Sequence, residues 1–355
     1  MNITYVLADS QHEWNSAEWR CAVPWRAFNR RPKRYRCHLL HINDFAELTP
    51  WAGNVLGGSD VIVLQRNIFP NTWKAIDHWK GRGKTVLVDV DDGYAQMTPD
   101  NVAYPFWFHG RMMDAQGKPV FQKPVPIELY PKCVEKTHGV ACASPYLTRD
   151  WEQHKSRYVP NYADLSIYKD TKRTRGNDRE FWVAWGGSMS HLASFTESGI
   201  LYAIARVFAT RPQARLVICG ADRRVFEAIP LRDSQKIHLE WVPHSAWPGR
   251  IANFDIALAP LVGEYDKRRS WIKPLEYSLC RTPWIASDNG AYDGFGEYGR
   301  LVPNTPDAWA DALADAIDNG YPPATVKAAH KWAMAQGIDD NLDKVANTYK
   351  ELMPL

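Results

Sequence analysis

The sequence predicts an α/β fold with two units, each a parallel β-sheet that carries helices on both faces. Short apolar runs alternate with amphipathic stretches along the whole chain, which is the pattern of such sheets. The 355 residues also exceed what one hydrophobic core usually serves. The polar run KDTKRTRGNDR at 169–179 is the sharpest change of composition. We therefore expect a first unit over 1–165, a linker over 166–180, a second unit over 181–335 and a terminal helix over 336–355.

The first unit opens with a strand at the start of the chain. Further apolar runs, each followed by polar residues, predict more strands of one sheet. The expected strands are 3–8, 61–65, 85–90 and 139–143. The sequence PNYAD at 160–164 is rich in turn formers and marks the end of this unit.

The second unit repeats the same alternation. Its expected strands are 181–184, 216–220, 237–241, 256–259 and 284–286, and its expected helices include 195–209 and 274–280. Beyond residue 307 the chain is expected to be helical, because Trp309, Leu313 and Ile317 recur at helical spacing.

Composition favours a cytoplasmic protein, or one that acts on a membrane surface from the cytosol, over a membrane-spanning or secreted one. The longest apolar run, near 256–262, is far shorter than the about 20 residues of a bilayer span. The chain turns polar at Asp9, unlike a signal peptide. The six cysteines form no C-x-x-C pair, so we expect reduced thiols rather than a zinc site or disulfides. Nothing in the sequence predicts an oligomeric state.

A glycine-rich turn follows the first strand of the second unit. Gly186, Gly187 and Ser188 stand where a helix begins a few residues later. Glycines let a backbone approach a diphosphate closely, and N–H and hydroxyl groups there can bind its oxygens. Taken alone, the segment fits a tight strand-to-helix turn equally well.

The stretch after strand 256–259 offers positive charge to such a diphosphate. Strand ends and helix starts of open α/β sheets bind phosphates because backbone N–H groups and the helix dipole point outward there. Four basic residues and a serine occupy this stretch: Lys267, Arg268, Arg269, Ser270 and Lys273. We expect the cations to neutralise the diphosphate.

Glu276 lies three residues after Lys273 and so shares its face of the predicted helix. A carboxylate in an otherwise apolar segment is suited to accept hydrogen bonds from the two vicinal hydroxyls of a ribose. The alternative is a surface pair of Lys273 and Glu276, which stabilises a helix by only a few tenths of a kcal/mol.

Together these motifs resemble the donor-binding region of the retaining GT-B glycosyltransferases, in particular a phage and bacterial branch similar to glycosyltransferase family 4. The resemblance rests on the basic-Ser pair, Lys-x-x-Glu-Tyr, the strand PWIASD, the loop GGSMSH and the PNYAD segment. The chain departs from that pattern at several positions, among them the region after strand 181–184, which lacks the Arg and Lys of many relatives. Arg268 stands where most relatives have the first glutamate of an E-x(7)-E pair, and Tyr162 stands where glycine is usual.

The resemblance implies a GT-B fold: two Rossmann-like domains that face a cleft, with a last helix that crosses back to the first domain. It implies transfer of a sugar from a nucleoside-diphosphate-sugar, with a UDP-sugar favoured, to a hydroxyl acceptor. Retention of configuration and independence of metal follow from the same resemblance. It also places His191 near the donor, so the candidate catalytic residues are Asp91, Asp92, His191 and Lys273.

Asp91 and Asp92 end the strand 85–90 and are expected on the acceptor side of the cleft, where they could orient the attacking hydroxyl. With Asp89 they also form Asp-x-Asp, the manganese motif of the other glycosyltransferase fold, GT-A. We prefer the acceptor role, because a GT-A enzyme would not need the second nucleotide pattern.

Arg20 and Arg66 are further expected cleft residues, on resemblance to the same group and because polar residues just past strand ends line such clefts. Structural ion pairs are the alternative for both.

A basic stretch, RAFNRRPKRYR at 26–36, contains no acid although the net charge of the whole chain is only +3. Charge runs usually face water. The functional alternative is an acceptor surface, formed by Arg30, Arg31 and Arg34, for a polyanion such as DNA, a lipid headgroup layer or an anionic glycan.

The acceptor expected from these features is a cell-envelope glycan or lipid, or a hydroxymethylated base in phage DNA. The 16 tryptophans suit sugars and bases alike. Two other readings of the scaffold stay open: a nucleotide-sugar epimerase, and a non-catalytic nucleic-acid-binding protein.

Overall fold

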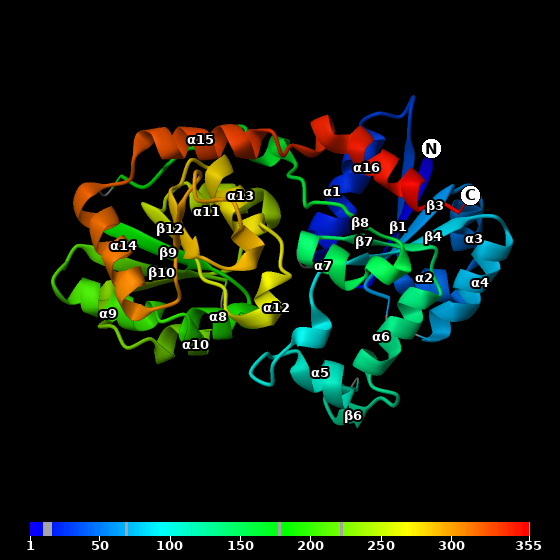
Figure 1. The fold of residues 1–355 in the computed structure, drawn as a ribbon, viewed down its shortest axis with the longest axis horizontal. Coiled ribbons are helices and arrows are strands. Elements are labelled where there is room, and N and C mark those ends of the chain that lie inside the picture. The colour runs from blue at the N-terminus through cyan, green and yellow to red at the C-terminus, as the bar shows by residue number, and fades with distance from the viewer. Residues whose placement is uncertain (10–15, 68–69, 115, 177–178, 221–222, 355) are drawn as a thin grey trace.

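The computed structural model describes residues 1–9, 16–67, 70–114, 116–176, 179–220 and 223–354. It consists of two α/β units side by side, each built on a six-stranded parallel sheet (Figure 1). This is the GT-B fold expected from the sequence, with two Rossmann-like units.

The first sheet has the strand order β2-β1-β3-β4-β7-β8. Its strands are β1 Asn2–Leu7, β2 Arg36–His41, β3 Val61–Gln65, β4 Thr85–Val90, β7 Gly139–Cys142 and β8 Ser156–Tyr158. Every residue of β3 and β4 is buried, because helices cover both faces of a parallel sheet.

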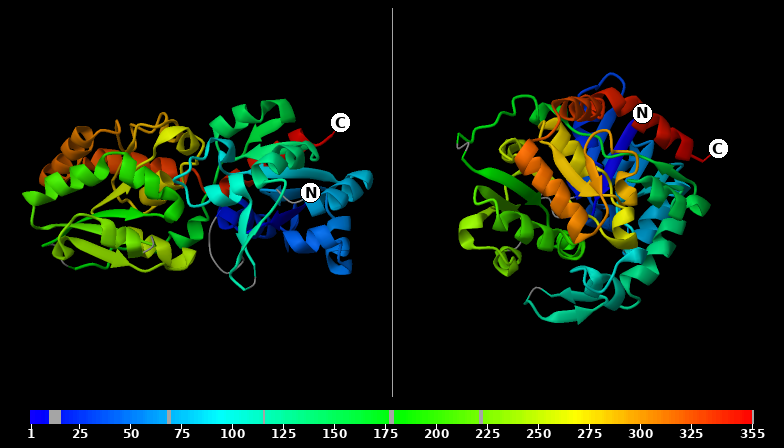
Figure 2. Two further views of the ribbon diagram at one scale, coloured as in Figure 1. Left: turned by 90° about the horizontal axis from the view of Figure 1, so that it is seen from below. Right: turned by 60° about the vertical axis from the view of Figure 1, so that its left-hand side comes forward.

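Helices connect these strands: α1 Val23–Asn29, α2 Ile42–Glu47, α3 Pro50–Gly57, α4 Trp73–Gly81, α5 Tyr104–His109, α6 Pro126–Glu135 and α7 Pro145–Asp150. A π-helix over Glu18–Ala22 precedes α1. Between α5 and α6 an antiparallel hairpin, β5 Arg111–Met113 with β6 Pro119–Phe121, projects from the body of the unit (Figure 2).

The second sheet has the order β11-β10-β9-β12-β13-β14, the 3-2-1-4-5-6 order of a dinucleotide-binding fold. Its strands are β9 Phe181–Gly186, β10 Ala214–Cys219, β11 Lys236–Leu239, β12 Ile256–Ala259, β13 Trp284–Ser287 and β14 Arg300–Val302.

The helix expected over 195–209 is two helices, α8 Leu192–Glu197 and α9 Ile200–Ala209. Gly199 separates them with a φ of 85°, which a helix cannot contain. The remaining helices of this unit are α10 Arg223–Ala228, α11 Trp247–Ile251, α12 Gly263–Lys267, α13 Ile272–Leu279, α14 Pro306–Asn319 and α15 Pro323–Met334.

The last helix, α16 Ile338–Leu352, lies against the first unit (Figure 1). The chain therefore crosses between the units twice. The two crossings meet at a parallel bridge between Ala163 and Gly337, where the Ile338 N–H donates to the Ala163 carbonyl over 2.8 Å.

The polar run expected as a linker lies along the second unit rather than free between the units. Arg173 and Arg175 both form ion pairs with Asp255, which stands just before β12. Residues 177 and 178 of this run are outside the described residues.

Candidate functional site

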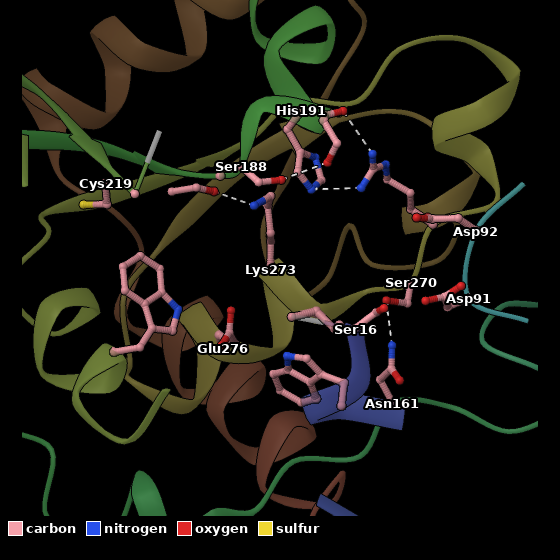
Figure 3. A pocket seen from close by; sticks show the side chains of 18 of the residues that line it. Ser16, Asp91, Asp92, Asn161, Ser188, His191, Cys219, Ser270, Lys273 and Glu276 are labelled. Atoms are coloured by element: carbon pink, nitrogen blue, oxygen red, sulfur yellow. Dashed lines mark hydrogen bonds between the residues drawn. The ribbon is translucent and has the colours of Figure 1, made fainter. Parts of the chain in front are cut away.

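A cavity of about 410 Å³ lies between the two units, at the carboxyl ends of both sheets (Figure 3). Its lining from the first unit is Ser16, Trp19, Arg20, Asp91, Asp92 and Asn161. Its lining from the second unit is Gly186, Gly187, Ser188, Ser190, His191, Cys219, Gly220, Glu240, Trp241, Val242, Trp247, Leu261, Arg269, Ser270, Ile272, Lys273, Glu276 and Tyr292. Most of the residues singled out in the sequence thus meet at one place.

Gly186 and Gly187 form the turn where β9 ends, and both positions exclude a larger residue. A Cβ on Gly186 would lie 2.6 Å from the Trp247 ring, and one on Gly187 would lie 2.7 Å from the Trp185 ring. The two rings pack against the turn, and the absence of side chains on the glycines leaves its backbone at the cavity.

Lys273 reaches this turn from α13, and its ammonium donates to the Gly186 carbonyl. Burial lowers the pKa of Lys273 to about 8, and the neighbouring Arg269 contributes to the decrease. The ammonium therefore lies in a poorly solvated position where an anion would stabilise its charge.

Glu276 enters the cavity one helical turn further along α13, and only 4% of it is exposed. Its Oε1 accepts a hydrogen bond of 3.3 Å from the Tyr168 hydroxyl and lies 3.9 Å from His244 Nε2. Burial raises the pKa of Glu276, and the surrounding donors and cations offset only part of this increase. The surface pair with Lys273 that was the alternative to a binding role is therefore not what the structure contains.

Of the three consecutive cations 267–269, only Arg269 lines the cavity. The Lys267 ammonium pairs with Glu264 over 2.5 Å, and Arg268 pairs with Asp150 over 2.6 Å. Successive residues at the end of a helix point about 100° apart, so one of three faces a given site. The donor role expected for Lys267 and Arg268 is corrected accordingly.

Arg269 is held by an ion pair of 2.7 Å with Asp266 and lies over the Tyr265 ring. Its Nη1 is 2.9 Å from His191 Nε2. Because a guanidinium only donates, His191 Nε2 is the acceptor, and the neutral ring carries its proton on Nδ1.

His191 Nδ1 is buried and has no hydrogen-bond partner among the described residues. Burial lowers the pKa of His191 well below its ordinary value, and the charges of Arg269 and Lys273 lower it further. A neutral imidazole thus presents a donor that a ligand oxygen could satisfy.

Asp91 and Asp92 line the opposite side of the cavity (Figure 3). Asp91 accepts a hydrogen bond of 2.6 Å from the Tyr94 hydroxyl and pairs with Arg66 over 3.2 Å. Burial alone would raise the pKa of Asp91, but Arg66 and the bonds from Ser16 and Tyr94 outweigh it, so the pKa is lowered.

Asp92 behaves differently although it is the next residue. Burial raises the pKa of Asp92 to about 6, and the charge of Asp91 adds to the rise while Arg269 opposes it. The Tyr265 hydroxyl of the second unit donates to Asp92 over 3.1 Å. The pKa values of these two neighbouring carboxyl groups are therefore shifted in opposite directions.

Arg20 and Arg66 are both in ion pairs. Arg20 is buried and binds both oxygens of Asp89, at 2.7 and 2.6 Å, while also lining the cavity. Arg66, outside the lining, holds Asp9 over 2.8 Å as well as Asp91. Both carboxylate oxygens of Asp89 thus accept hydrogen bonds from Arg20. Within the described residues no group of three or more His, Cys, Asp or Glu is placed to hold a metal ion.

The basic patch expected as an acceptor surface is paired with acids that lie 300 residues later in the sequence. Arg30 forms two hydrogen bonds with Asp339, at 2.9 and 2.8 Å. Arg34 pairs with Asp343 over 2.9 Å, and Arg31 donates to the Asp339 carbonyl. These arginines hold α16 against the first unit, which corrects the expectation of an open polyanion surface.

Sequence reasoning missed the aromatic side of the cavity. Trp19 belongs to the first unit and Trp241 and Trp247 to the second, and 47% of Trp241 is exposed. Cys219 and Gly220 could have been predicted as site residues, because they stand at the carboxyl end of the expected strand 216–220. The tryptophans had no such marker, since other tryptophans, such as Trp79, Trp185 and Trp309, are buried in the core.

Asn161 of the PNYAD segment connects the two halves of the site. Its Oδ1 accepts from Arg20 over 2.8 Å, and its Nδ2 donates to the Ser270 hydroxyl over 2.9 Å. Ser270 is thereby fixed at the start of α13, beside the cavity.

Other sequence expectations have plain outcomes. The six cysteines are free thiols, five of them buried. No helix in the described ranges has the length and apolar character needed to cross a membrane.

Comparison with known proteins gives the class. Residues 187–319, somewhat over a third of the chain, match the family model described as glycosyl transferases group 1. No curated protein matches this sequence.

Several solved structures share the architecture over nearly the whole chain. HepE from Anabaena, in complex with UDP and glucose, has a TM-score of 0.65 at 14% identity and covers 99% of both chains. Sucrose-phosphate synthase from Thermosynechococcus elongatus has a TM-score of 0.66 at 14% identity, covering 99% of this chain and 98% of that one. A putative UDP-N-acetylglucosamine 2-epimerase from Listeria monocytogenes has a TM-score of 0.56 at 10% identity, covering 98% of this chain and 95% of that one.

Two Rossmann-like units around a shared cavity, with the last helix returned to the first unit, define a protein of the GT-B class. This chain is a glycosyltransferase of that class, and its second unit carries the group 1 glycosyl transferase region.

Proposed function

We propose that the protein transfers a sugar from a UDP-sugar to a hydroxyl acceptor, with retention of configuration and without a metal ion. The observation that carries the proposal is the cavity itself, where a buried cation, a buried carboxylate and a glycine turn converge at the carboxyl ends of the second sheet. The fold shared with proteins solved with UDP supports the choice of nucleotide.

In this proposal the diphosphate lies against the turn at Gly186 and Gly187. Lys273 and Arg269 supply positive charge, and His191 donates its Nδ1 proton to a phosphate or sugar oxygen. The leaving diphosphate gains negative charge as the glycosidic bond breaks, so fixed cations and donors stabilise the transition state more than the ground state.

The nucleoside would occupy the other end of the cavity. Glu276 accepts hydrogen bonds from the ribose hydroxyls, and the base stacks on the aromatic wall formed by Trp241 and Trp247. Support for this orientation comes from the order of the lining along α13, where Lys273 precedes Glu276 by about one helical turn.

The acceptor hydroxyl would approach from the first unit, beside Asp91 and Asp92. Asp91 keeps its charge through Arg66 and Tyr94, so it can accept a hydrogen bond from the hydroxyl and orient it. We propose an envelope glycan or lipid as acceptor rather than DNA, because the arginines at 30–34 are paired with α16.

Glu276→Ala and Lys273→Ala should each lower donor turnover at least about tenfold, equivalent to ~1.4 kcal/mol. Each should also reduce the thermal stabilisation that UDP gives the protein, since the stabilisation by a ligand decreases as its Kd rises. Lys267→Ala is the matched control, because its ammonium pairs with Glu264 outside the cavity.

Near-normal turnover in both variants would remove these residues from the mechanism. Product analysis tests the rest: a free sugar epimer formed without acceptor would favour an epimerase, an inverted anomer would refute retention, and loss of activity with a chelator would refute independence of metal.

A further inference from the structure

The β5–β6 hairpin concentrates apolar surface that the rest of the molecule does not cover. Nine large hydrophobic side chains are exposed among the described residues, and five of them lie between residues 102 and 121: Val102, Met112, Met113, Val120 and Phe121. Scattered exposed hydrophobic residues are normal on a protein surface, but a cluster marks an interaction site.

The pairing of the strands divides the hairpin into two faces. Arg111 lies opposite Phe121 and Met113 opposite Pro119, so these four side chains share one face, while Met112 and Val120 share the other. Met113 is 59% exposed and Phe121 64%, against 36% and 38% for Met112 and Val120. We call Met112, Met113, Val120 and Phe121 the hairpin patch.

The backbone at Gly110 fixes the direction in which the hairpin leaves α5. Gly110 ends α5 with a φ of 67°, and its carbonyl accepts from the Gln122 N–H over 2.8 Å. A Cβ on Gly110 would lie 2.2 Å from the Gln122 carbonyl oxygen. The chain therefore leaves the helix at a fixed angle, which directs the hairpin away from the unit (Figure 2).

Charge around the hairpin patch is positive. Arg111, Lys118 and Lys123 are exposed, and none of them forms an ion pair within the described residues. The single acid between residues 111 and 123 is Asp114, whose carboxylate accepts from the backbone N–H groups of Gln116 and Lys118 at 2.9 and 2.8 Å. Its charge is thus engaged in building the turn.

We propose that the hairpin patch docks the protein on an anionic lipid bilayer surface. Four apolar side chains on a narrow ribbon offer much less area than the about 800 Å² that each partner of a stable protein complex contributes. A bilayer interface receives such side chains individually and attracts the flanking cations through its surface potential.

The location of the hairpin is consistent with an acceptor that arrives from that surface. Asp91 bonds Tyr94, and the Tyr94 ring stacks on Trp107 of α5 with 3.9 Å between centroids. The hairpin follows α5 directly. Asp91, Tyr94 and Trp107 therefore connect the acceptor side of the cavity to α5, and the backbone connects α5 to the hairpin patch. The docking itself does not depend on the proposed function, because it is measured without turnover.

The test is cosedimentation of the full-length protein with phosphatidylglycerol-containing vesicles and with phosphatidylcholine vesicles. We expect binding to the anionic vesicles only, and weaker binding as salt rises. Met113→Ser combined with Phe121→Ser should lower the partition coefficient at least about tenfold, from the transfer energy of two such side chains. Lys118→Ala combined with Lys123→Ala should lower it and reduce the salt dependence.

Tyr202→Ser is the matched control, because Tyr202 is 74% exposed on α9 of the second unit and should leave binding unchanged. An unchanged circular dichroism spectrum and an unchanged Tm in every variant would show that the protein remains folded. The proposal is overturned if the wild type does not bind anionic vesicles or if the Met113 and Phe121 variant binds equally well. A dimer of the wild type that the same variant dissociates would assign the hairpin patch to a second copy instead.

Discussion

Lys273 and Glu276 share one helix face, and burial shifts both of their protonation equilibria toward the neutral form. The pKa of Lys273 is lowered to about 8 and that of Glu276 is raised. The cavity therefore holds two groups whose charges are poorly solvated. A nucleotide whose diphosphate binds Lys273 and whose ribose hydroxyls bind Glu276 would compensate the desolvation of both charges.

A pH dependence follows for the free enzyme. The Lys273 ammonium is charged below its pKa and neutral above it, so kcat/KM for the donor should fall as the pH rises through about 8. Lys273→Arg carries a cation that does not titrate in this range and should move that fall to higher pH. A profile of kcat/KM against pH for both proteins measures this, and an unshifted fall in the variant would assign it to another group.

Residue by residue, the sequence predicted the chemistry of the site better than its geometry. Glu276, Lys273 and the glycine turn follow from strand ends and helix spacing, and they do line the cavity. The orientation of Lys267 and Arg268 could not be predicted, because it depends on where α12 ends and on partners in distant elements. The aromatic residues that line the cavity, Trp19, Trp241 and Trp247, have no local sequence pattern that marks them as site residues.

At the scale of elements, buried strands were predictable and short or divided elements were not. The strands β3 and β4 are mostly apolar and β12 is entirely apolar, because both faces of these strands are covered. The three-residue strands β8 and β14 and the hairpin are too short for a periodic signal. The division between α8 and α9 depends on one glycine whose positive φ the sequence does not reveal.

The last helix is an example of an element placed by distant contacts. On α16, Leu342, Val345 and Tyr349 are buried in the core of the first unit, and the Tyr349 hydroxyl lies 3.1 Å from that of Tyr5 on β1. Opposite charges at its start match the arginines that follow α1. Apolar burial is the larger effect, since exposed ion pairs contribute about 0–1 kcal/mol each.

Leu342→Ala should therefore destabilise the first unit by about 2 to 5 kcal/mol, the cost of a cavity at a fully buried leucine. Denaturant unfolding measures the change. Asn347→Ala, on the exposed face of the same helix, should change the free energy of unfolding by less than about 0.5 kcal/mol. Equal effects of the two substitutions would mean that α16 does not contribute to this core.

For the whole molecule, the site is complete only when the two units come together. The chain crosses between them at Ala163 and Gly337, on one side of the cleft. On the other side, contacts join α12 and the residues after it to the first unit. The covalent crossings and the side-chain contacts therefore lie at different edges of the cavity, as in proteins whose domains close about a hinge. We call the contacts of Tyr265 with Asp92 and of Arg268 with Asp150 the clasp.

Arg268 is the central residue of the clasp. Its guanidinium binds both oxygens of Asp150, at 2.6 and 3.1 Å, and its carbonyl accepts from Ser144 over 2.8 Å. Its side chain also passes so close to Gly93 that a Cβ there would lie 2.3 Å from Arg268 Cδ. The glycine that follows Asp91 and Asp92 thus makes room for a cation of the second unit.

Arg268→Ala should consequently act on turnover rather than on nucleotide binding. UDP would still find Lys273 and Glu276 within the second unit, so its Kd should be nearly unchanged by calorimetry. The acceptor side would be held less closely, and kcat should fall about tenfold, or ~1.4 kcal/mol.

Asp150→Asn should produce a similar loss, and the double variant should be little worse than either, because both substitutions remove the same interaction. Lys267→Ala, one residue away but outside the clasp, should leave kcat unchanged. Additive losses, or a weakened Kd for UDP in the Arg268 variant, would show that Arg268 acts on the donor and does not position the two units.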